Sequence, residues 1–378
     1  MKLTFAKSDL ENALRVPSLT VGADKNEISS QYIFREVGGV FEILSYNGPT
    51  FSSSRLVCQS SSEAGEVSSF TIPSKRLRMW LSAVEDSSLV FDFDGEKVTA
   101  TCPRGSVIFQ SMDPSEFPYW DEDMESASKV AEVSSSLLRE AVMYARLFVS
   151  ENESQEPRLC NMQFQEGFLY ATNDASGVEI SIEGMEKCTS RLRGKNTGTL
   201  SKFLSFCETV SIYEHDEGTI FVADTGSVLG EEKPSHDFPK ILLGAAQRSP
   251  KNYWVFDKEE MLTCIKILTA SADWQEELKI RLTLRKVQEN IVMSMKSSSG
   301  EDVELKIPCI ESESDEEAED LPKKGFPISA KALARVFPQT WGNEIKVGLA
   351  ERSPGGFLSL EEKKEGMKRL TVLGWILE

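Results

Sequence analysis

The sequence contains few of the residues from which metal centres and hydrolytic sites are built. Its 378 residues include two histidines, His215 and His236, and seven cysteines that form no Cys-x-x-Cys pair. A zinc site needs clustered Cys and His ligands, and a hydrolase needs a nucleophile beside a base. No Gly-rich phosphate-binding loop and no dinucleotide-binding fingerprint occurs either. We therefore expect a protein that is not an enzyme and that holds no metal and no cofactor.

Long apolar runs are absent as well. No segment approaches the ~20 apolar residues that span a membrane, and residues 1–7 lack the apolar run and cleavage site of a secretory signal. An odd number of widely spaced cysteines is typical of reduced thiols in the cytosol. The composition, 40% hydrophobic and 27% charged, is that of a globular chain. We expect a cytoplasmic protein without a membrane partner.

The charge balance is acidic. Asp and Glu total 60 against 42 Lys and Arg, which gives a formal net charge of −18. A surface that is acidic everywhere repels nucleic acid. The average does not say where the charges lie, so their distribution along the chain decides whether a nucleic-acid partner is excluded.

An internal repeat organises the chain. Three kinds of marker recur at close to one third of the 378-residue length. Phe-Pro corners follow strands at Phe117 and Phe238, and residues able to cap a helix start recur twice in each third. These are Ser8, Ser134 and Asp257 for the first helix, and Ser74, Thr197 and Ser329 for the second. We predict three copies of one domain, with boundaries 1–124, 125–249 and 250–378.

Between the predicted helices, hairpin signals indicate antiparallel strands. Apolar segments flank Gly38-Gly39, Asp94-Gly95, Glu166-Gly167 and Glu289-Asn290. The helices carry apolar residues at a spacing of three and four, which packs one face against a sheet. Each third therefore combines antiparallel strands with two short helices, and this pattern predicts an α+β fold.

The second helix of each third carries basic residues and no acidic ones. These helices, predicted at 74–83, 197–207 and 329–337, contain no Asp or Glu. At the frequency of the whole chain, about five acidic residues would be expected there. The cations on them are Lys75, Arg76, Arg78, Lys202, Lys331 and Arg335. Cations on a solvated helix face are common, but three equivalent acid-free helices favour a shared basic surface for DNA phosphates.

In these features the sequence resembles a bacterial-type DNA sliding clamp, the beta subunit of the replicative DNA polymerase. The resemblance covers essentially the whole chain and depends on the order and spacing of motifs that are weak one by one. They are Met1-Lys2-Leu3-Thr4-Phe5, Phe70-Thr71-Ile72-Pro73-Ser74-Lys75, Ser115-Glu116-Phe117-Pro118, Asn161-Met162-Gln163-Phe164 with Ala171-Thr172-Asn173-Asp174, and Asp237-Phe238-Pro239. The chain is identified as a divergent member, as a phage or plasmid would encode.

The resemblance implies three tandem clamp domains, antiparallel sheets outside and helices inside, in a head-to-tail homodimer that closes into a ring. The ring encircles double-stranded DNA without reading its sequence. Such a processivity factor tethers a DNA polymerase and is loaded onto DNA by a clamp loader. The resemblance implies that it works at the nucleoid, in the cytoplasm of a bacterial or phage-infected cell. The residues that the resemblance places on the DNA-facing surface are Lys25, Lys75, Arg76, Arg78, Arg139, Arg146, Lys202, Lys331 and Arg335.

Two further surfaces are implied by the resemblance. The dimer interface pairs an edge strand of the first domain, with Val107 and Phe109, with a helix end of the third, with Ile267 and Leu268. Each of these is equally compatible with an ordinary core position. An apolar pocket for partner peptides is implied at Leu159, Thr172, Val178, Pro239, Leu243, Val372, Leu373 and Trp375. The alternative for these residues is that they simply close the interface between two domains.

The sequence departs from the family in three places. The family's His-Arg-Leu is replaced by Ala175-Ser176-Gly177, and its Met-Pro-Met ending by Leu373-Gly374-Trp375, so the fit of host clamp-binding peptides is in question. The run from Glu311 to Asp320, which is predominantly acidic, has no counterpart and is expected to form an external loop.

Two other functions compete with the clamp. A clamp-fold scaffold or decoy would bind clamp partners without encircling DNA. A metal-dependent nuclease, the weaker alternative, would need paired carboxylates, and these residues are abundant throughout the chain.

Overall fold

The computed structural model describes residues 1–23, 27–60, 69–85, 87–154, 156–173, 175–239, 252–270, 281–287, 290–296, 302–313, 326–352 and 355–376. The chain forms two compact units. Unit 1 comprises Met1–Arg139, Lys187–Leu192 and Asn196–Pro234, and unit 2 comprises Glu140–Glu186, Arg193–Lys195 and Ser235–Glu378. The boundary between the units falls inside the second predicted domain, and the division into three domains stays a prediction.

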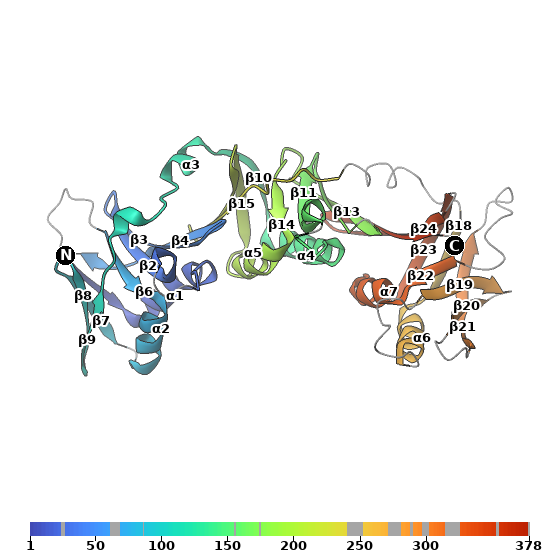
Figure 1. Cartoon of the computed structure of the whole chain (residues 1–378), viewed down its shortest axis with the longest axis horizontal. Helices are drawn as coiled ribbons and strands as arrows, with labels where there is room; N and C mark the ends of the chain where they lie inside the picture. The colour runs from blue at the N-terminus through green and yellow to red at the C-terminus, as the bar shows by residue number, and fades with distance from the viewer. Residues whose placement is uncertain are drawn as a thin grey trace. The chain divides into compact units, whose positions relative to one another are not determined.

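Unit 1 contains two antiparallel sheets (Figure 1), with strand orders β5-β1-β7-β8-β9 and β10-β15-β16-β17-β4-β3-β2-β6. The strands of the first are β1 (Lys2–Ala6), β5 (Gln59–Ser60), β7 (Ser88–Phe93), β8 (Lys97–Cys102) and β9 (Gly105–Gln110). Those of the second are β2 (Gln31–Val37), β3 (Val40–Asn47), β4 (Thr50–Leu56), β6 (Ser69–Pro73), β10 (Ser128–Ser134), β15 (Thr209–His215), β16 (Gly218–Ala223) and β17 (Val228–Glu232).

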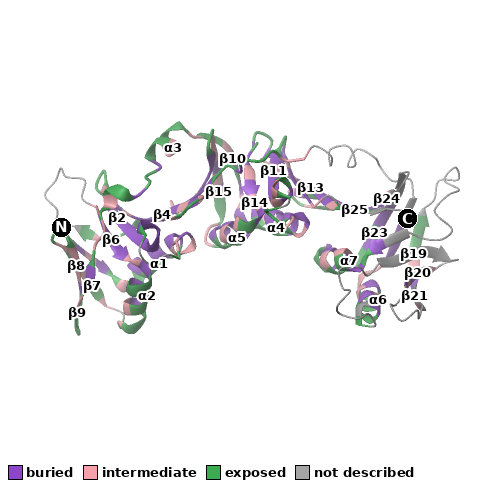
Figure 2. Ribbon diagram, in the orientation of Figure 1, coloured by how far each residue is buried: buried purple, intermediate pink, exposed green. Residues whose placement is uncertain are grey.

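The helices of unit 1 are α1 (Lys7–Leu14), α2 (Ser74–Ala83), α3 (Asp121–Ser126) and α5 (Thr197–Leu204). Figure 2 shows buried residues where α1 and α2 meet the sheets, and exposed residues along α3. Apolar residues at alternate strand positions, such as Leu3 and Phe5, meet the apolar face of a helix, such as Leu10 of α1, in one core cluster. The Phe34 and Phe70 rings stack within it, 4.9 Å apart between centroids.

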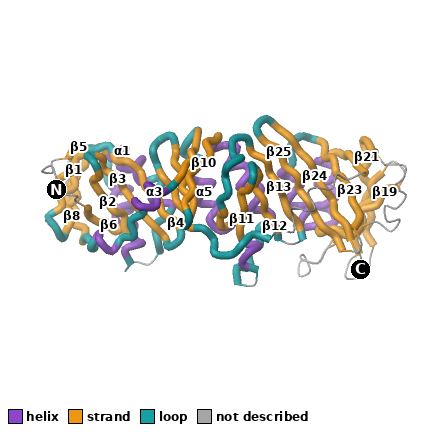
Figure 3. The backbone as a smooth tube through the Cα atoms, turned by 90° about the horizontal axis from the view of Figure 1, so that it is seen from above, coloured by secondary structure: helices purple, strands orange, loops and turns teal. Residues whose placement is uncertain are grey.

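Unit 2 is built on one long antiparallel sheet, ordered β14-β11-β12-β13-β25-β24-β23-β18-β21-β20-β19-β22. Figure 3 shows β13, β25 and β24 side by side. The strands are β11 (Asn161–Gln165), β12 (Phe168–Thr172), β13 (Ser176–Ile182), β14 (Arg191–Arg193), β18 (Asn252–Asp257), β19 (Arg281–Val287), β20 (Asn290–Lys296), β21 (Asp302–Glu313), β22 (Phe326–Ser329), β23 (Glu344–Arg352), β24 (Gly355–Lys364) and β25 (Met367–Ile376). Helices α6 (Lys258–Ala270) and α7 (Ala330–Val336) belong to it, while α4 (Ser135–Ala145) crosses the unit boundary at Glu140.

The predicted repeat is visible in the order of elements along the chain. A strand runs directly into the first helix at β1–α1, β10–α4 and β18–α6, and a meander of three strands follows each time. These meanders are β2-β3-β4, β11-β12-β13 and β19-β20-β21. The second helices α2, α5 and α7 precede the meanders β7-β8-β9, β15-β16-β17 and β23-β24-β25. The α+β class and all four predicted hairpins are therefore confirmed.

Within each unit, one strand pair joins two repeats. In unit 1, β4 pairs with β17, and in unit 2, β13 pairs with β25. Both pairs join the last strand of a first meander to the last strand of the next repeat's second meander. In the β4–β17 pair the Phe51 ring covers Gly230, where an added Cβ would lie 1.9 Å from the ring. Gly230 thus leaves space for Phe51, which also stacks on Trp120 at 3.9 Å between centroids.

Two of the predicted helix caps are formed by side-chain hydrogen bonds in the structure. Asp257 Oδ1 accepts a hydrogen bond from Glu260 N at 2.9 Å, and Ser329 Oγ accepts one from Ala332 N at 3.3 Å. Ser8, Ser74 and Thr197 lie inside their helices, because α1, α2 and α5 begin earlier, after Ala6, Pro73 and Asn196. Among the described residues, no helix is long and apolar enough to cross a membrane.

Candidate nucleic-acid interface

Helix α2 presents its cations to solvent. Leu77 and Leu81, four residues apart, are buried against the core, with at most 4% of their surface exposed. This orientation leaves Lys75, Arg76 and Arg78 exposed. No carboxylate within the described part of the chain forms an ion pair with any of them. The predicted acid-free helix thus carries three cations whose charge is not neutralised locally.

Helices α5 and α7 repeat this arrangement with fewer cations. On α5, the buried Leu200, Phe203 and Leu204 turn Lys202 outward. On α7, the buried Leu333 and Val336 leave Lys331 exposed and Arg335 half-buried. None of these three cations has an ion-pair partner among the described residues.

The two predicted cations of the α4 region are exposed as well. The Arg139 Nε donates a hydrogen bond to Ser201 Oγ of α5 at 3.1 Å, which holds the guanidinium beside that helix. Arg146 is the first residue of the 3₁₀ turn that follows α4 and is exposed. Lys25, the remaining predicted DNA-facing residue, lies outside the described residues.

Several cations elsewhere on the described surface are paired with carboxylates. Arg35 Nη1 lies 2.6 Å from Asp121 Oδ2, Arg104 Nη2 lies 2.6 Å from Glu85 Oε1, and Lys195 Nζ lies 3.0 Å from Glu153 Oε1. Paired charges present little field to a distant phosphate, whereas unpaired ones attract it at long range. The unpaired cations of α2, α5 and α7, together with Arg139 and Arg146, therefore make these segments suited to contact with nucleic acid.

The predicted interface residues divide into exposed and buried members. Phe109 of β9 and Leu268 of α6 are buried in their own units, with 1% and 0% of their surface exposed. Strand alternation turns the neighbouring Ile108 outward, with 53% exposed, and Ile267 of α6 is 46% exposed. Val107 is half-buried. The structure thus offers Ile108 and Ile267, rather than Phe109 and Leu268, to a partner.

The predicted peptide-pocket residues gather on neighbouring strands of unit 2. Thr172 of β12 pairs with Gly177 of β13, which pairs in turn with Val372 of β25. Thr172, Val178, Val372, Leu373 and the nearby Leu159 are all at least 92% covered. Pro239 is half-buried. Leu243 and the Trp375 side chain lie outside the described part. The structure brings the residues of the sheet together, and the pocket itself stays a prediction.

The run from Glu311 to Asp320, predicted to be an external loop, begins as a strand. Glu311–Glu313 form the end of strand β21 rather than a loop, since Val255 of β18 pairs with Glu311 there. Residues 314–320 lie outside the described part.

A buried charged cluster in unit 2 was not predicted. The Arg369 guanidinium, with 2% of the side chain exposed, lies between the rings of Tyr144 and Trp341. Its Nε donates to Glu362 Oε2 at 2.7 Å. Glu140 accepts hydrogen bonds from Trp341 Nε1 and Lys364 Nζ. Burial raises the pKa of Glu140, and these two donors outweigh that effect and hold the pKa below its usual value.

Comparison by sequence finds no relative of this chain, whereas comparison by structure finds many. No protein-family model matches the sequence, and no curated protein matches it. Solved structures do match over the whole length. The beta subunit of the DNA polymerase of Streptococcus pyogenes is 12% identical, with a TM-score of 0.82 and coverage of 100% of each chain. The chain has the fold of a bacterial DNA sliding clamp.

Two other clamps give the same result. The DNA polymerase sliding clamp of Caulobacter crescentus is 16% identical, with a TM-score of 0.81, and the match covers 100% of this chain and 99% of that one. The DNA polymerase III subunit beta of Pseudomonas aeruginosa is 13% identical, with a TM-score of 0.81 and coverage of 99% of each chain. The sliding-clamp fold predicted from the sequence is therefore confirmed. At these identities the likeness establishes the fold, and the function requires a separate argument.

Proposed function

We propose that the protein is a DNA sliding clamp, a non-enzymatic processivity factor that encircles duplex DNA and tethers a DNA polymerase. The observation that carries the proposal is the set of unpaired cations on α2, α5 and α7. They lie at equivalent places in a chain whose net charge is −18. Groups of three or more potential metal ligands do not occur among the described residues, so a nuclease centre has no support there.

Cations arranged in this way suit a sliding ring. Phosphate contacts from Lys and Arg are independent of sequence and fall with salt. A closed ring retains DNA by its topology, so each phosphate contact can stay weak and the ring can move along the duplex. Acidic residues elsewhere repel DNA from the other surfaces of the protein.

The strand pairing supports a ring made of two chains. In the pairs β4–β17 and β13–β25, the last strand of a first meander pairs with the last strand of the next repeat's second meander. The two strands at equivalent places that lack such a pair are β21, which ends the first meander of the third repeat, and β9, which ends the second meander of the first repeat. Strand β9 ends its sheet, with β8 as its only neighbour in the described strand order. Strand β21 pairs with β20 over residues 302–308 and with β18 over residues 309–313. The edge of residues 302–308 that faces away from β20 therefore has no described strand partner. In a dimer, β9 of each copy can pair with β21 of the other copy. These two identical contacts close a head-to-tail ring of two chains.

Exposed apolar residues mark the same two strands. Ile108 of β9 is 53% exposed and Ile310 of β21 is 55% exposed, and Ile267 of α6 is 46% exposed. A contiguous exposed apolar patch is typical of an interface, and contact between two copies would bring these side chains into one patch. We propose that Ile108, Ile267 and Ile310 form the apolar part of the contact between the two copies.

The partners proposed for the ring are a DNA polymerase and a clamp loader. The sheet β12-β13-β25, with Thr172, Val178 and Val372, is the proposed wall of their peptide site. This part of the proposal depends on the resemblance and on the gathering of the predicted residues on neighbouring strands.

Topological retention tests the proposal. The protein is loaded onto nicked circular DNA with a cognate clamp loader, and the circle is then cut once. A sliding clamp stays bound to the circle through gel filtration and leaves after linearisation. Retention that is unchanged by cutting would mean ordinary groove binding. Failure to bind circles with any loader, together with capture of polymerase peptides, would favour the scaffold or decoy.

A further inference from the structure

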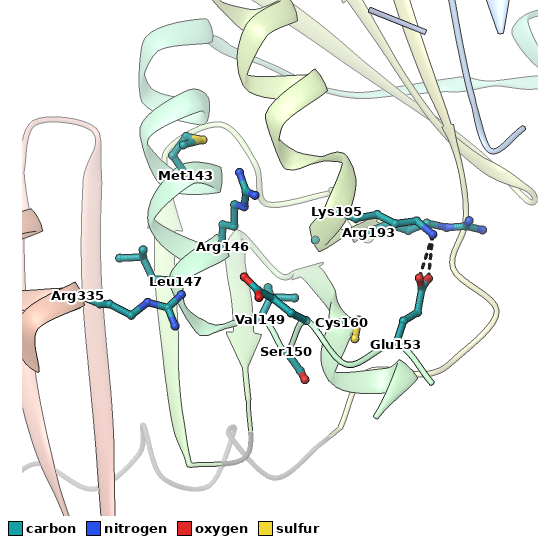
Figure 4. Close-up of a pocket in the computed structure, with 12 residues that line it drawn as sticks. Met143, Arg146, Leu147, Val149, Ser150, Glu153, Cys160, Arg193, Lys195 and Arg335 are labelled. Carbon is teal, nitrogen blue, oxygen red and sulfur yellow. Dashed lines mark hydrogen bonds and ion pairs between the residues drawn. The ribbon is translucent and has the colours of Figure 1, made fainter. Parts of the chain in front are cut away.

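A cavity of about 450 Å³ lies in unit 2 beside the end of α4. Figure 4 shows the residues that line it. Met143, Arg146 and Leu147 come from the end of α4 and the following turn, and Val149, Ser150, Glu151 and Glu153 from the next loop. Arg193–Lys195 and Cys160 form another side, and Arg335 reaches in from α7. The volume is within the range of small-molecule sites, which hold roughly 300–1,000 Å³.

The cavity is cationic. Its lining contains Arg146, Arg193, Lys195 and Arg335 against two carboxylates, Glu151 and Glu153. Glu153 is already occupied, because both of its oxygens accept hydrogen bonds from Lys195 Nζ, at 3.0 and 3.1 Å. Arg146 and Arg335 have no ion-pair partner among the described residues. Two guanidinium groups therefore line the cavity without an ion pair, beside one lining carboxylate, Glu151, that pairs with neither of them.

One wall of the cavity is aliphatic and closely packed. It consists of Met143, Leu147 and Val149. Gly194 permits this packing, since a Cβ at Gly194 would lie 2.4 Å from Val149 Cγ1 and 2.9 Å from the Cys160 carbonyl oxygen. The cavity thus has an apolar wall beside two unpaired guanidiniums, an arrangement that fits a ligand with an anionic head and a body that can pack on an apolar surface.

A nucleotide matches both parts. Arginine binds phosphate through two parallel N–H donors. A single phosphate is too small to use the aliphatic wall, whereas the sugar and base of a nucleotide would cover it. A nucleotide inside a duplex is paired and stacked and cannot enter a cavity without being extruded. The ligand must therefore be an unpaired nucleotide, free or within a single strand.

We propose that this cavity binds one nucleoside monophosphate unit, with its phosphate between Arg146 and Arg335 and its base against Met143, Leu147 and Val149. The choice of a nucleic-acid ligand rests on the proposed function, which places both arginines on the DNA-facing surface. The wall has no aromatic ring, so binding is weaker than on a stacking platform.

Cys160 provides a reporter inside the cavity. Burial raises the pKa of its thiol, so alkylation by N-ethylmaleimide is best followed at about pH 9, where more thiolate is present. Cys102 of β8, half-buried in unit 1, serves as the internal control. Peptide mass spectrometry of the full chain gives both alkylation rates. The probes are thymidine 5′-monophosphate, an oligo-dT strand, a blunt duplex and an acidic phosphoserine peptide.

We expect both nucleotide probes to slow alkylation of Cys160 and to leave Cys102 unchanged. At a probe concentration ten times its Kd the rate falls about tenfold, because that is the factor by which the free fraction decreases. Protection by the strand alone would identify a strand residue as the ligand, and protection by the mononucleotide alone would identify a free nucleotide. Both results support the proposed chemistry, and the duplex is expected to give no protection.

Two methionine variants separate the cavity from the general electrostatic field. Met143 and Met79 are both exposed helix residues, at 40% and 64%, so Met143→Glu and Met79→Glu each add one negative charge to a proposed DNA-facing helix and should fold. Met143→Glu places its carboxylate at the cavity wall and should abolish protection. Met79→Glu should preserve it.

Three results would overturn the proposal: equal Cys160 rates with and without both nucleotide probes, equal protection in Met143→Glu, or stronger protection by the phosphoserine peptide than by the oligonucleotide. These measurements need no ring and no loader. If nucleotides protect Cys160 but the protein is not retained on circular DNA, the proposed clamp function is contradicted and the proposed nucleotide site is not. If the protein is retained on circles but Cys160 is not protected, the nucleotide site is contradicted and the clamp function is not.

Discussion

The guanidinium carbon of Arg369 lies over the Trp341 ring, 3.8 Å from the ring centroid. The same carbon lies 3.9 Å from the centroid of the Tyr144 ring, so a charged side chain with 2% exposure packs against two aromatic rings. The charge is satisfied by Glu362 and by the carbonyl oxygen of Gln339. The Tyr144 hydroxyl hydrogen-bonds with Thr371 Oγ1 at 2.8 Å, and burial raises the pKa of Tyr144 to about 12. This cluster ties α4 to β24 and β25 within unit 2.

Replacing Arg369 by Met should strongly destabilise unit 2. The variant leaves Glu362, 13% exposed, without its cation, and loss of one partner from a buried pair costs about 3–5 kcal/mol. Lys368→Met on the same strand is the matched control. Its pair with Glu361 has both side chains more than half exposed, and such pairs contribute about 0–1 kcal/mol. Urea denaturation of the two variants should show a large and a negligible shift of the midpoint, and equal shifts would contradict this role.

Glu214 should make stability depend on acid pH. Burial raises the pKa of Glu214, but hydrogen bonds from Ser190 and Thr189 outweigh this and lower it overall. A carboxyl group whose pKa is lowered in the folded state stabilises the protein above its unfolded pKa of about 4.3, and that contribution is lost as the pH falls through the folded value.

The Glu214→Gln variant should accordingly be less stable than the parent at pH 7. The difference should narrow as the pH falls below about 4, where the parent's own carboxylate is protonated. Denaturant midpoints measured across this range give the curve. Asp216→Asn, at an exposed neighbouring position, is the control and should leave the denaturant midpoint at pH 7 nearly unchanged. A constant difference at all pH values would rule out the titration of Glu214 as its cause.

Ile108→Asp and Ile267→Asp should convert the proposed dimer to folded monomers. A carboxylate at either exposed position cannot be desolvated without a partner. Light scattering gives the mass in solution, and circular dichroism shows that the fold persists. Val57→Asp changes an apolar residue of unit 1 that is 75% exposed, and it should leave the dimer intact.

The buried neighbours should behave differently. Phe109→Asp and Leu268→Asp place a carboxylate in a core and should lower the melting temperature before any effect on assembly appears. Ile108→Asp and Ile267→Asp variants that both remain dimeric would contradict the interface.

The sequence predicts the repeated elements because they depend on local signals. Gly38 and Gly39 adopt φ values of 59° and 79°, as the tight turn between β2 and β3 requires, and Asp257 caps α6 as its side chain suggests. The helix cations were also predictable, since the spacing of Leu77 and Leu81 determines which face of α2 is buried.

Features that depend on long-range packing could not be read from the sequence. Phe109 and Ile108 are equally apolar neighbours, and only the packing of β9 decides which of them is exposed. Arg369 packs against Tyr144, which is more than two hundred residues away in the sequence. No local sequence pattern therefore predicts that this arginine is buried. Likewise, Arg146 and Arg335 come together at one cavity only because α4 and α7 approach it from distant parts of the sequence.

Neutralising the cations of α2 should weaken binding to duplex DNA in proportion to the number of phosphate-binding charges removed. The triple variant Lys75→Gln, Arg76→Gln, Arg78→Gln removes three unpaired charges, and each phosphate contact contributes about 0.9 to the slope of log affinity against log salt. The double variant Lys129→Gln, Arg104→Gln is the control, because both residues already pair with carboxylates, Glu132 and Glu85. Anisotropy titrations of labelled duplex at several salt concentrations give the slopes. We expect a reduction of up to about 2.7 for the triple variant, if all three residues contact phosphates, and little change for the control. An unchanged slope for the triple variant would remove α2 from the DNA-facing surface.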